Sequence, residues 1–203
     1  MARRKEHTHD EIRQMAVAAV INHLHQQDVN QLSLRQIATM IGYAPSTLVK
    51  VFGSYQLLLL TVSRQTLAQL LGQLKQADRS SSIETLDAMA IIYSQFALQH
   101  PHAFRLVFSL KMSNDEALPA THANLINELF TLVESCLCQL FASATASDLA
   151  VMSRVLWGGI HGLTTLALDE KLFIEQVPLE MLLKNHVSGY LAGMGCHKEA
   201  ACY

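Results

Sequence analysis

Apolar side chains recur at intervals of three and four residues along almost the whole of this 203-residue chain. That spacing places them on one face of an α-helix, whereas a half-buried strand would alternate with a period of two. No stretch of the sequence shows convincing alternation. The pattern therefore predicts an all-α fold of about nine helices.

Polar residues, glycine and proline predict where these helices begin and end. Thr8 and Glu11 form a capping box before the first helix, Ser33 caps the second, and either Ser147 or Thr145 caps the eighth. Gly42 ends the second helix because glycine readily adopts a left-handed conformation. Pro45 suits the first turn of the third helix, since its φ is fixed. The predicted helices cover approximately residues 9–27, 34–41, 45–52, 54–78, 81–99, 102–111, 121–142, 148–168 and 179–193.

Composition narrows the class of protein. Half of the residues are hydrophobic, which is enough for a sizeable core without disulfides. Charged and amide side chains interrupt every apolar stretch well before the roughly 18 residues that a membrane span needs. The opening segment MARRKEHTHDE is not followed by an apolar run of the signal-peptide kind. We expect a cytoplasmic protein that is not embedded in a membrane.

The four cysteines are expected to be reduced structural thiols. Cys136 and Cys138 lie about 200° apart around a helix axis, so they cannot share a metal ion without unwinding it. Cys196, His197 and Cys202 match no zinc spacing. We expect neither a metal nor a cofactor.

Charge is distributed unevenly along the chain. Residues 1–60 carry six basic and four acidic side chains, while the remainder carries nine basic and thirteen acidic ones. A polyanion would therefore meet the N-terminal part more favourably.

Residues 32–52 read LSLRQIATMIGYAPSTLVKVF and combine two short helices with a glycine turn. This geometry allows a second helix to project from an apolar support into the major groove of DNA. The alternative is an ordinary corner between packed helices. If the segment binds DNA, the outward side of the second helix carries Pro45, Ser46, Thr47, Val49 and Lys50.

The longer segment LSLRQIATMIGYAPSTLVKVFGSYQLLL resembles the signature of the tetracycline-repressor (TetR/AcrR) family of bacterial transcription regulators. The resemblance implies a DNA-binding domain over 1–53 and a dimerising, effector-binding domain over 54–203. It also implies a homodimer that reads a palindromic operator in double-stranded DNA. The residues that it places at the DNA are Ser33, Arg35, Ala44, Pro45, Ser46, Thr47, Val49, Lys50 and Tyr55.

Three positions depart from the family pattern. Val49 stands where a tyrosine is usual, Val51 where a histidine or tyrosine is usual, and Tyr55 where a lysine is usual. Tyr55 can still donate a phenolic hydrogen bond to phosphate, but the loss of charge makes the salt dependence of binding shallow. An adaptor that has lost DNA binding is therefore a second interpretation.

The later segment RVLWGGIHGLTTLAL is similar to a Trp-x-x-x-His-Gly pattern found in one C-terminal subclass of the same family, with Trp157, His161 and Gly162 at those positions. Gly158, Gly159 and Gly162 would each weaken a helix by about 1 kcal/mol relative to alanine. Either a ligand or another backbone comes close to them, or neighbouring helices pack tightly there.

The effector is expected to be an apolar small molecule, because many carbon and sulfur contacts and few charges surround the implied cavity. His161 is the best polar candidate for orienting it, although a packing role is an equal alternative. An enzyme that uses His161 is a much weaker interpretation, since the sequence contains no recognisable nucleophile or phosphate-binding motif. The candidate lining is Met89, Tyr93, Phe96, Phe104, Phe108, Met112, Phe130, Trp157 and His161.

Two expectations concern the whole assembly. The fourth helix, from Ser54, is expected to be the only link between the DNA-reading head and the effector cavity, and a repressor that ignores ligands is the alternative. The dimer is expected to form through the last two helices by burying Leu149, Met152, Leu156, Leu163, Leu182, Leu183, Val187 and Leu191.

Overall fold

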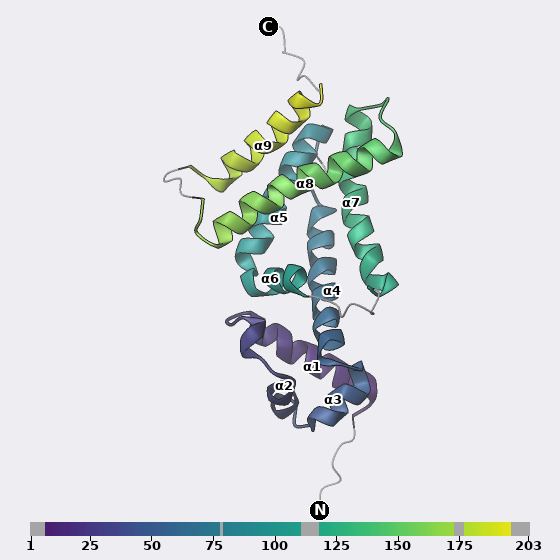
Figure 1. Ribbon diagram of the computed structural model, residues 1–203, viewed down its shortest axis with the longest axis vertical. Helices are drawn as coiled ribbons and strands as arrows, with labels where there is room; N and C mark the ends of the chain where they lie inside the picture. Colours follow the sequence, from purple (N-terminus) through teal and green to yellow (C-terminus); the bar gives the residue numbers. More distant parts are fainter. Residues whose placement is uncertain (1–6, 78, 111–117, 173–176, 196–203) are drawn as a thin grey trace, which may run out of the picture. The chain divides into compact units, whose positions relative to one another are not determined.

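The computed structural model describes residues 7–77, 79–110, 118–172 and 177–195. Within these ranges it contains nine α-helices and one short 3-10 helix, and no strand, which confirms the predicted all-α fold (Figure 1). The elements are α1 (His9–Leu24), η1 (Val29–Gln31), α2 (Leu34–Met40), α3 (Pro45–Phe52), α4 (Tyr55–Leu74), α5 (Ser82–Gln99), α6 (Pro101–Ser109), α7 (Ala120–Leu140), α8 (Ala146–Leu168) and α9 (Leu179–Gly193).

The predicted capping residues begin their helices as expected. Thr8 and Glu11 form a reciprocal capping box at α1, and Ser33 forms a second one with Gln36 at α2. Thr145 rather than Ser147 caps α8, again reciprocally, with Asp148. These bonds satisfy amide groups that a helix start leaves without partners.

Two helices, α1 and α4, end at least three residues earlier than predicted. α1 stops at Leu24 because the next residues form a turn closed on the His23 carbonyl, and Asp28 then caps the unpredicted η1 by accepting a hydrogen bond from the Asn30 amide at 2.9 Å. α4 ends at Leu74, since the amide of Ala77 bonds to the Leu74 carbonyl in a turn. Local polar partners therefore override the helical spacing at both ends.

The chain divides into two compact units. The first contains the described residues up to Ala68 and those from His100 to Pro119, and the second contains residues from Gln69 to Gln99 and from Ala120 onward. The chain therefore passes between the units at three points, one of them inside α4. The expectation that the fourth helix is the only link is wrong.

The core of the first unit joins α1, α2, α3 and α6. Its fully buried members include Val20 on α1, Ile37 on α2 and Leu48 on α3. Leu106 of α6 belongs to the same core, although it follows the other members by more than 40 residues. Helix α6 therefore supports the three N-terminal helices.

The second unit packs α5, α7, α8 and α9 against one another. Of the residues expected to form the dimer face, five are buried within the single chain, namely Met152, Leu156, Leu183, Val187 and Leu191. That expectation is wrong for these five, because the α8 and α9 stripes that it used face the protomer's own core. None of the described helices is long and apolar enough to cross a lipid bilayer.

Candidate functional site

The predicted helix-turn-helix forms in the first unit. Gly42 follows α2 with a φ of 75°, a left-handed conformation that glycine adopts without strain. The amide of Tyr43 then bonds to the Ala38 carbonyl at 2.9 Å, which closes the turn before α3. Ile37, Ala38 and Leu48 are fully buried and hold the two helices together.

The outward side of α3 presents a mixed polar and apolar face. Ala44, Pro45, Ser46, Val49 and Lys50 are exposed, and Thr47 is half-buried. Hydroxyl groups can hydrogen-bond to base edges or phosphates, a lysine attracts phosphates, and a valine can contact a thymine methyl group. This face therefore has the chemistry needed to read a DNA groove.

Four predicted DNA contacts are available for an external partner. Arg35 lies exposed on α2, and Ser46, Thr47 and Lys50 lie on α3. None of these four side chains has a hydrogen-bond partner within the described ranges. Their polar atoms can therefore bind a ligand without first breaking an internal bond.

Two other predicted DNA contacts are already engaged inside the protein. The Ser33 hydroxyl donates to Oε1 of Gln36 at 2.7 Å and accepts from the Gln36 amide. The Tyr55 hydroxyl donates to the Leu32 carbonyl at 2.5 Å, and burial raises the pKa of this phenol. The Tyr55 hydroxyl was predicted to donate a hydrogen bond to a DNA phosphate. Its proton instead bonds to the Leu32 carbonyl and holds α4 beside the start of α2.

Arg13 of α1 makes a polar contact to α3, and His7, just before α1, makes one to the turn that precedes α3. The sequence did not indicate either contact. Nδ1 of His7 lies 2.7 Å from the Tyr43 hydroxyl. Arg13 donates from Nη2 to the Val51 carbonyl at 2.9 Å, and its guanidinium carbon lies 5.0 Å from the centre of the Phe52 ring. These partners are 36 to 39 residues apart in sequence, so helical spacing within either segment could not reveal them.

Four of the predicted effector residues meet in the second unit. We call Tyr93, Phe130, Trp157 and His161 the aromatic cluster. The Tyr93 hydroxyl lies 2.8 Å from Nδ1 of His161, and the ring centroids of Trp157 and His161 are stacked 5.0 Å apart. Phe130 of α7 meets Trp157 edge to face at 5.7 Å. The structure thus joins three helices through residues predicted from the Trp-x-x-x-His-Gly pattern and from the aromatic inventory.

The ionisable members of the aromatic cluster are held neutral. Burial raises the pKa of Tyr93 far above its ordinary value, and a hydrogen bond from Trp157 offsets only part of that increase. Burial lowers the pKa of His161, which favours an uncharged imidazole. Since indole nitrogen can only donate, Trp157 donates to the Tyr93 oxygen, and Tyr93 can donate to Nδ1 of His161. Hydrogen bonds therefore run from Trp157 through Tyr93 to His161 within the aromatic cluster.

A charged network borders the aromatic cluster. The guanidinium of Arg154 lies 4.0 Å from the centre of the Phe130 ring and pairs with Glu134, which also accepts a hydrogen bond from Ser153. Arg154 was not among the residues predicted from the sequence. On α8, Arg154 lies three residues before Trp157, so these two side chains share a helix face. On α7, Glu134 lies four residues after Phe130, so that pair shares a face too. The sequence does not show that these faces of α7 and α8 pack against each other, so it could not predict the network.

The remaining predicted effector residues do not all join this cluster. Met89 and Phe96 are buried on α5, in the same unit as the cluster. Phe104 and Phe108 belong to the first unit, where their ring centroids are 5.0 Å apart. Met112 lies outside the described residues.

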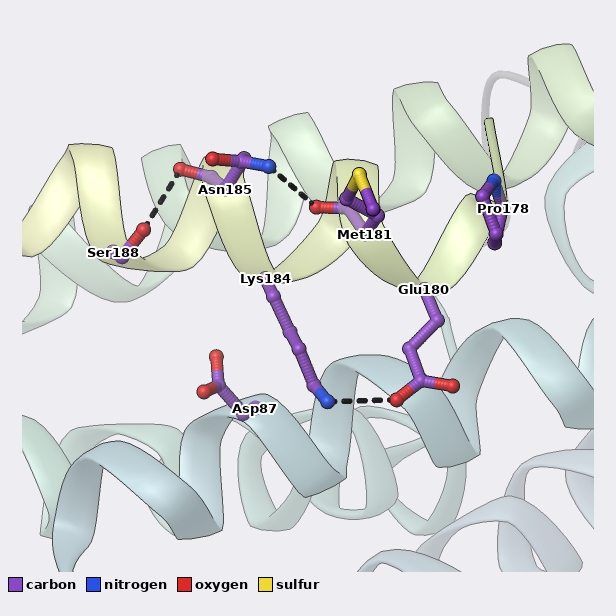
Figure 2. Close-up of a pocket in the computed structure, with 7 residues that line it drawn as sticks. All are labelled: Asp87, Pro178, Glu180, Met181, Lys184, Asn185 and Ser188. Atoms are coloured by element: carbon purple, nitrogen blue, oxygen red, sulfur yellow. Dashed lines mark hydrogen bonds and ion pairs between the residues drawn. The ribbon is translucent and has the colours of Figure 1, made fainter. Parts of the chain in front are cut away.

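A surface groove of about 420 Å³ lies along α9 and reaches Asp87 of α5 (Figure 2). Lys184 and Glu180 extend from α9 toward α5, and Nζ of Lys184 donates to Oε1 of Glu180 at 2.7 Å. Glu180, followed by Asp87, raises the pKa of Lys184. None of the predicted effector residues that the structure describes lines this groove. Within the described ranges, no three His, Cys, Asp or Glu side chains are placed to hold a metal ion.

Comparisons with known proteins identify a family for the C-terminal part of the chain. Residues 86–188 match the family described as "Tetracyclin repressor-like, C-terminal domain". A search among curated proteins gave no match.

Solved structures share the fold at low sequence identity. A protein of unknown function from Rhodococcus sp. RHA1 is similar with a TM-score of 0.74 and 21% identity over 95% of this chain and 98% of that one. A tetR-family transcriptional regulator from Streptomyces coelicolor gives 0.65 and 15%, over 92% and 81% of the two chains. The repressor FadR of Thermus thermophilus, solved with lauroyl-CoA, gives 0.64 and 17%, over 94% and 98%.

Proposed function

Because the chain belongs to the tetracycline repressor-like family of transcriptional regulators, we propose that it is a repressor that leaves a palindromic operator when an apolar small molecule binds. Residues 1–53 bind DNA in this proposal, and residues 54–203 bind the effector and a second copy of the chain. The protein acts in the cytoplasm and needs no catalytic group.

The observation that carries the proposal is the outward face of α3. Its short helix follows a glycine turn, rests on a buried apolar support, and leaves the side chains of Ser46, Thr47 and Lys50 without hydrogen-bond partners among the described residues. A helix of this kind can enter the major groove with its N-terminal residues against the bases.

The effector part of the proposal is supported by the aromatic cluster. Four ring systems come together there, and burial disfavours the charged forms of Tyr93 and His161, its two titratable side chains. The lauroyl-CoA in the Thermus thermophilus repressor is a ligand with a long apolar chain. We propose an effector with substantial apolar surface for this protein too.

The dimer part of the proposal is supported by an exposed stripe on α8. Val151, Val155 and Leu166 are 62%, 53% and 43% exposed, and Gly158 and Gly162 lie on the same helix face with open space where a Cβ would stand. An apolar face of this kind in a single chain commonly marks a protein interface. We propose that two copies meet along this face of α8 rather than through the buried residues expected from sequence.

Operator binding can be tested directly. DNA selected from a random pool by the full-length protein should contain two half-sites related by a two-fold axis, about one helical turn apart or somewhat more. In fluorescence anisotropy, Lys50→Ala should weaken binding to every duplex, whereas Thr47→Ala should cost about 1 kcal/mol on the selected site, the scale of one lost hydrogen bond. If both variants bind like the parent protein, α3 is not the reading helix.

A further inference from the structure

We propose that two contacts position the reading helix α3: Arg13 of α1 holds its C-terminal end, and His7, just before α1, holds Tyr43 in the turn that leads into α3. These residues set DNA specificity without touching a base. This inference rests on the proposed DNA-binding function. None of His7, Arg13 and Tyr43 is among the residues expected at the DNA.

The C-terminal end of α3 needs an external partner. The last four carbonyl groups of any helix lack partners inside the helix. In α3, the Val49 carbonyl accepts a hydrogen bond from the backbone amide of Gly53 at 2.8 Å. Arg13 satisfies the Val51 carbonyl at 2.9 Å and places a positive charge where the helix dipole favours one. Its guanidinium also lies over the Phe52 ring, so the helix end is held by two different contacts.

The N-terminal end of α3 is held less firmly by its own residues. Ala44 occupies the N-cap position and provides no side-chain cap. The adjacent Tyr43 is instead fixed through its hydroxyl, 2.7 Å from Nδ1 of His7, with the two rings in an edge contact. We call the Arg13 contacts and the His7–Tyr43 contact the two clamps. Arg13 lies in the second turn of α1 and His7 directly precedes Thr8, whose capping box with Glu11 anchors the start of that helix.

The side chains that face DNA lie between these two clamps. Ser46, Thr47 and Lys50 can bond to a duplex together only if α3 keeps one rotation about its axis, because useful hydrogen bonds tolerate only a few tenths of an ångström. Loss of a clamp should therefore impair base readout, which demands geometry, more than phosphate attraction, which tolerates displacement. If Arg13 instead contacted a phosphate directly, its loss should impair phosphate attraction more than base readout.

The test uses the full-length protein, its in vitro selected duplex and a scrambled duplex, with anisotropy titrations at several salt concentrations. Arg13→Met keeps the apolar stem but removes the charge and donors, Arg13→Lys restores one charged donor, and Tyr43→Phe removes only the hydroxyl. Gln14→Ala is the matched control, because Gln14 is the exposed neighbour on α1.

We expect Arg13→Met to lower affinity for the selected duplex about tenfold and affinity for the scrambled duplex less than about twofold, with an unchanged salt slope. Arg13→Lys should recover part of the loss, Tyr43→Phe should show a smaller loss of the same kind, and Gln14→Ala none. Circular dichroism confirms that each variant is folded; should Arg13→Met not fold, Arg13→Lys and Tyr43→Phe decide the question by the same ratio.

Two results would overturn the inference while leaving the proposed function intact. Equal losses on both duplexes with a salt slope reduced by about 0.9 per contact would make Arg13 a phosphate-binding residue. Unchanged binding by the Arg13 and Tyr43 variants would remove the positioning role altogether. If the parent protein selects no sequence, the proposed function fails and the inference fails with it.

Discussion

Burial of His161 predicts that the stability of the second unit depends on pH near neutrality. Burial lowers the pKa of its imidazole below the unfolded value of about 6.5. As pH falls through that value, the unfolded chain takes up more protons than the folded chain, so the free energy of unfolding decreases. The contribution of His161 is fully present above about pH 6.5 and is lost toward its lower folded pKa.

We therefore expect the parent protein to lose stability between about pH 7.5 and pH 5.5, and His161→Gln to lose less over the same interval. Urea denaturation followed by circular dichroism measures both changes. His25→Gln is the control, because His25 is exposed just after α1. An identical pH dependence in the parent and His161→Gln proteins would show that burial of this imidazole does not govern the effect.

Residue roles were predictable where they follow from one helix and not where they need two. Leu48 and Phe52 point inward on α3, so the spacing alone placed Val49 and Lys50 on the outer side. Tyr55 shows the opposite case, because its hydroxyl bonds to a carbonyl 23 residues earlier. Only the packing of α4 beside the start of α2 reveals that its proton is already used.

At the scale of secondary structure, α8 and α9 pack closely because Gly159 of α8 has no side chain and leaves room for the His186 ring of α9. A Cβ at Gly159 would stand 2.1 Å from Nε2 of His186, which itself lies 3.1 Å from the Leu156 carbonyl. This glycine therefore fits the tight-packing interpretation, since the histidine ring fills its place. Gly158, one residue earlier, has nothing within 4 Å of that position.

This difference predicts opposite effects of two neighbouring substitutions. Gly159→Ala should destabilise the protein by roughly 1–2 kcal/mol, because the histidine must leave its carbonyl partner despite the better helix propensity of alanine. Gly158→Ala should be neutral or stabilising by up to about 1 kcal/mol in the single chain. Thermal unfolding of both variants and of the double variant Gly159→Ala/His186→Ala checks this. A Gly159→Ala protein as stable as the parent would contradict it.

Helix starts were more predictable than helix partners. A start depends on residues within one turn, so Thr8, Ser33 and Thr145 revealed the beginnings of α1, α2 and α8. The ends of α1 and α4 depend on turns that compete with continued helix, and both were predicted too late. The stripes of α8 and α9 were also misread, because either face of an apolar helix could be the buried one.

At the scale of the assembled molecule, the exposed face of α8 predicts how two copies associate. Val155→Glu should produce a folded monomer, because it places a charge in an interface that would otherwise exclude water. Leu98→Glu is the control, since Leu98 is 49% exposed on α5 and lies outside the proposed face. Light scattering at micromolar concentration should give a dimeric mass for the parent and the control. A monomeric parent protein would remove the dimer from the proposal.

The second prediction at this scale is that effector and DNA oppose each other through a coupling free energy. α4 runs without interruption from the first unit into the second, and it offers one route for that coupling. A tenfold release of DNA requires about 1.4 kcal/mol of difference in effector affinity between the two states, and DNA must weaken effector binding by the same factor. We expect at least one compound in a panel of apolar and cationic molecules to release the selected duplex in anisotropy titrations, with the apolar ones more effective.

Tyr93→Phe should shift the compound concentration at half-release while leaving DNA affinity without compound unchanged, because the hydroxyl belongs to the aromatic cluster and not to the DNA-reading face. Tyr190→Phe on α9 is the matched control. If no compound releases the duplex that the protein selects, effector control fails and a ligand-independent repressor is the function that the DNA-reading face still supports.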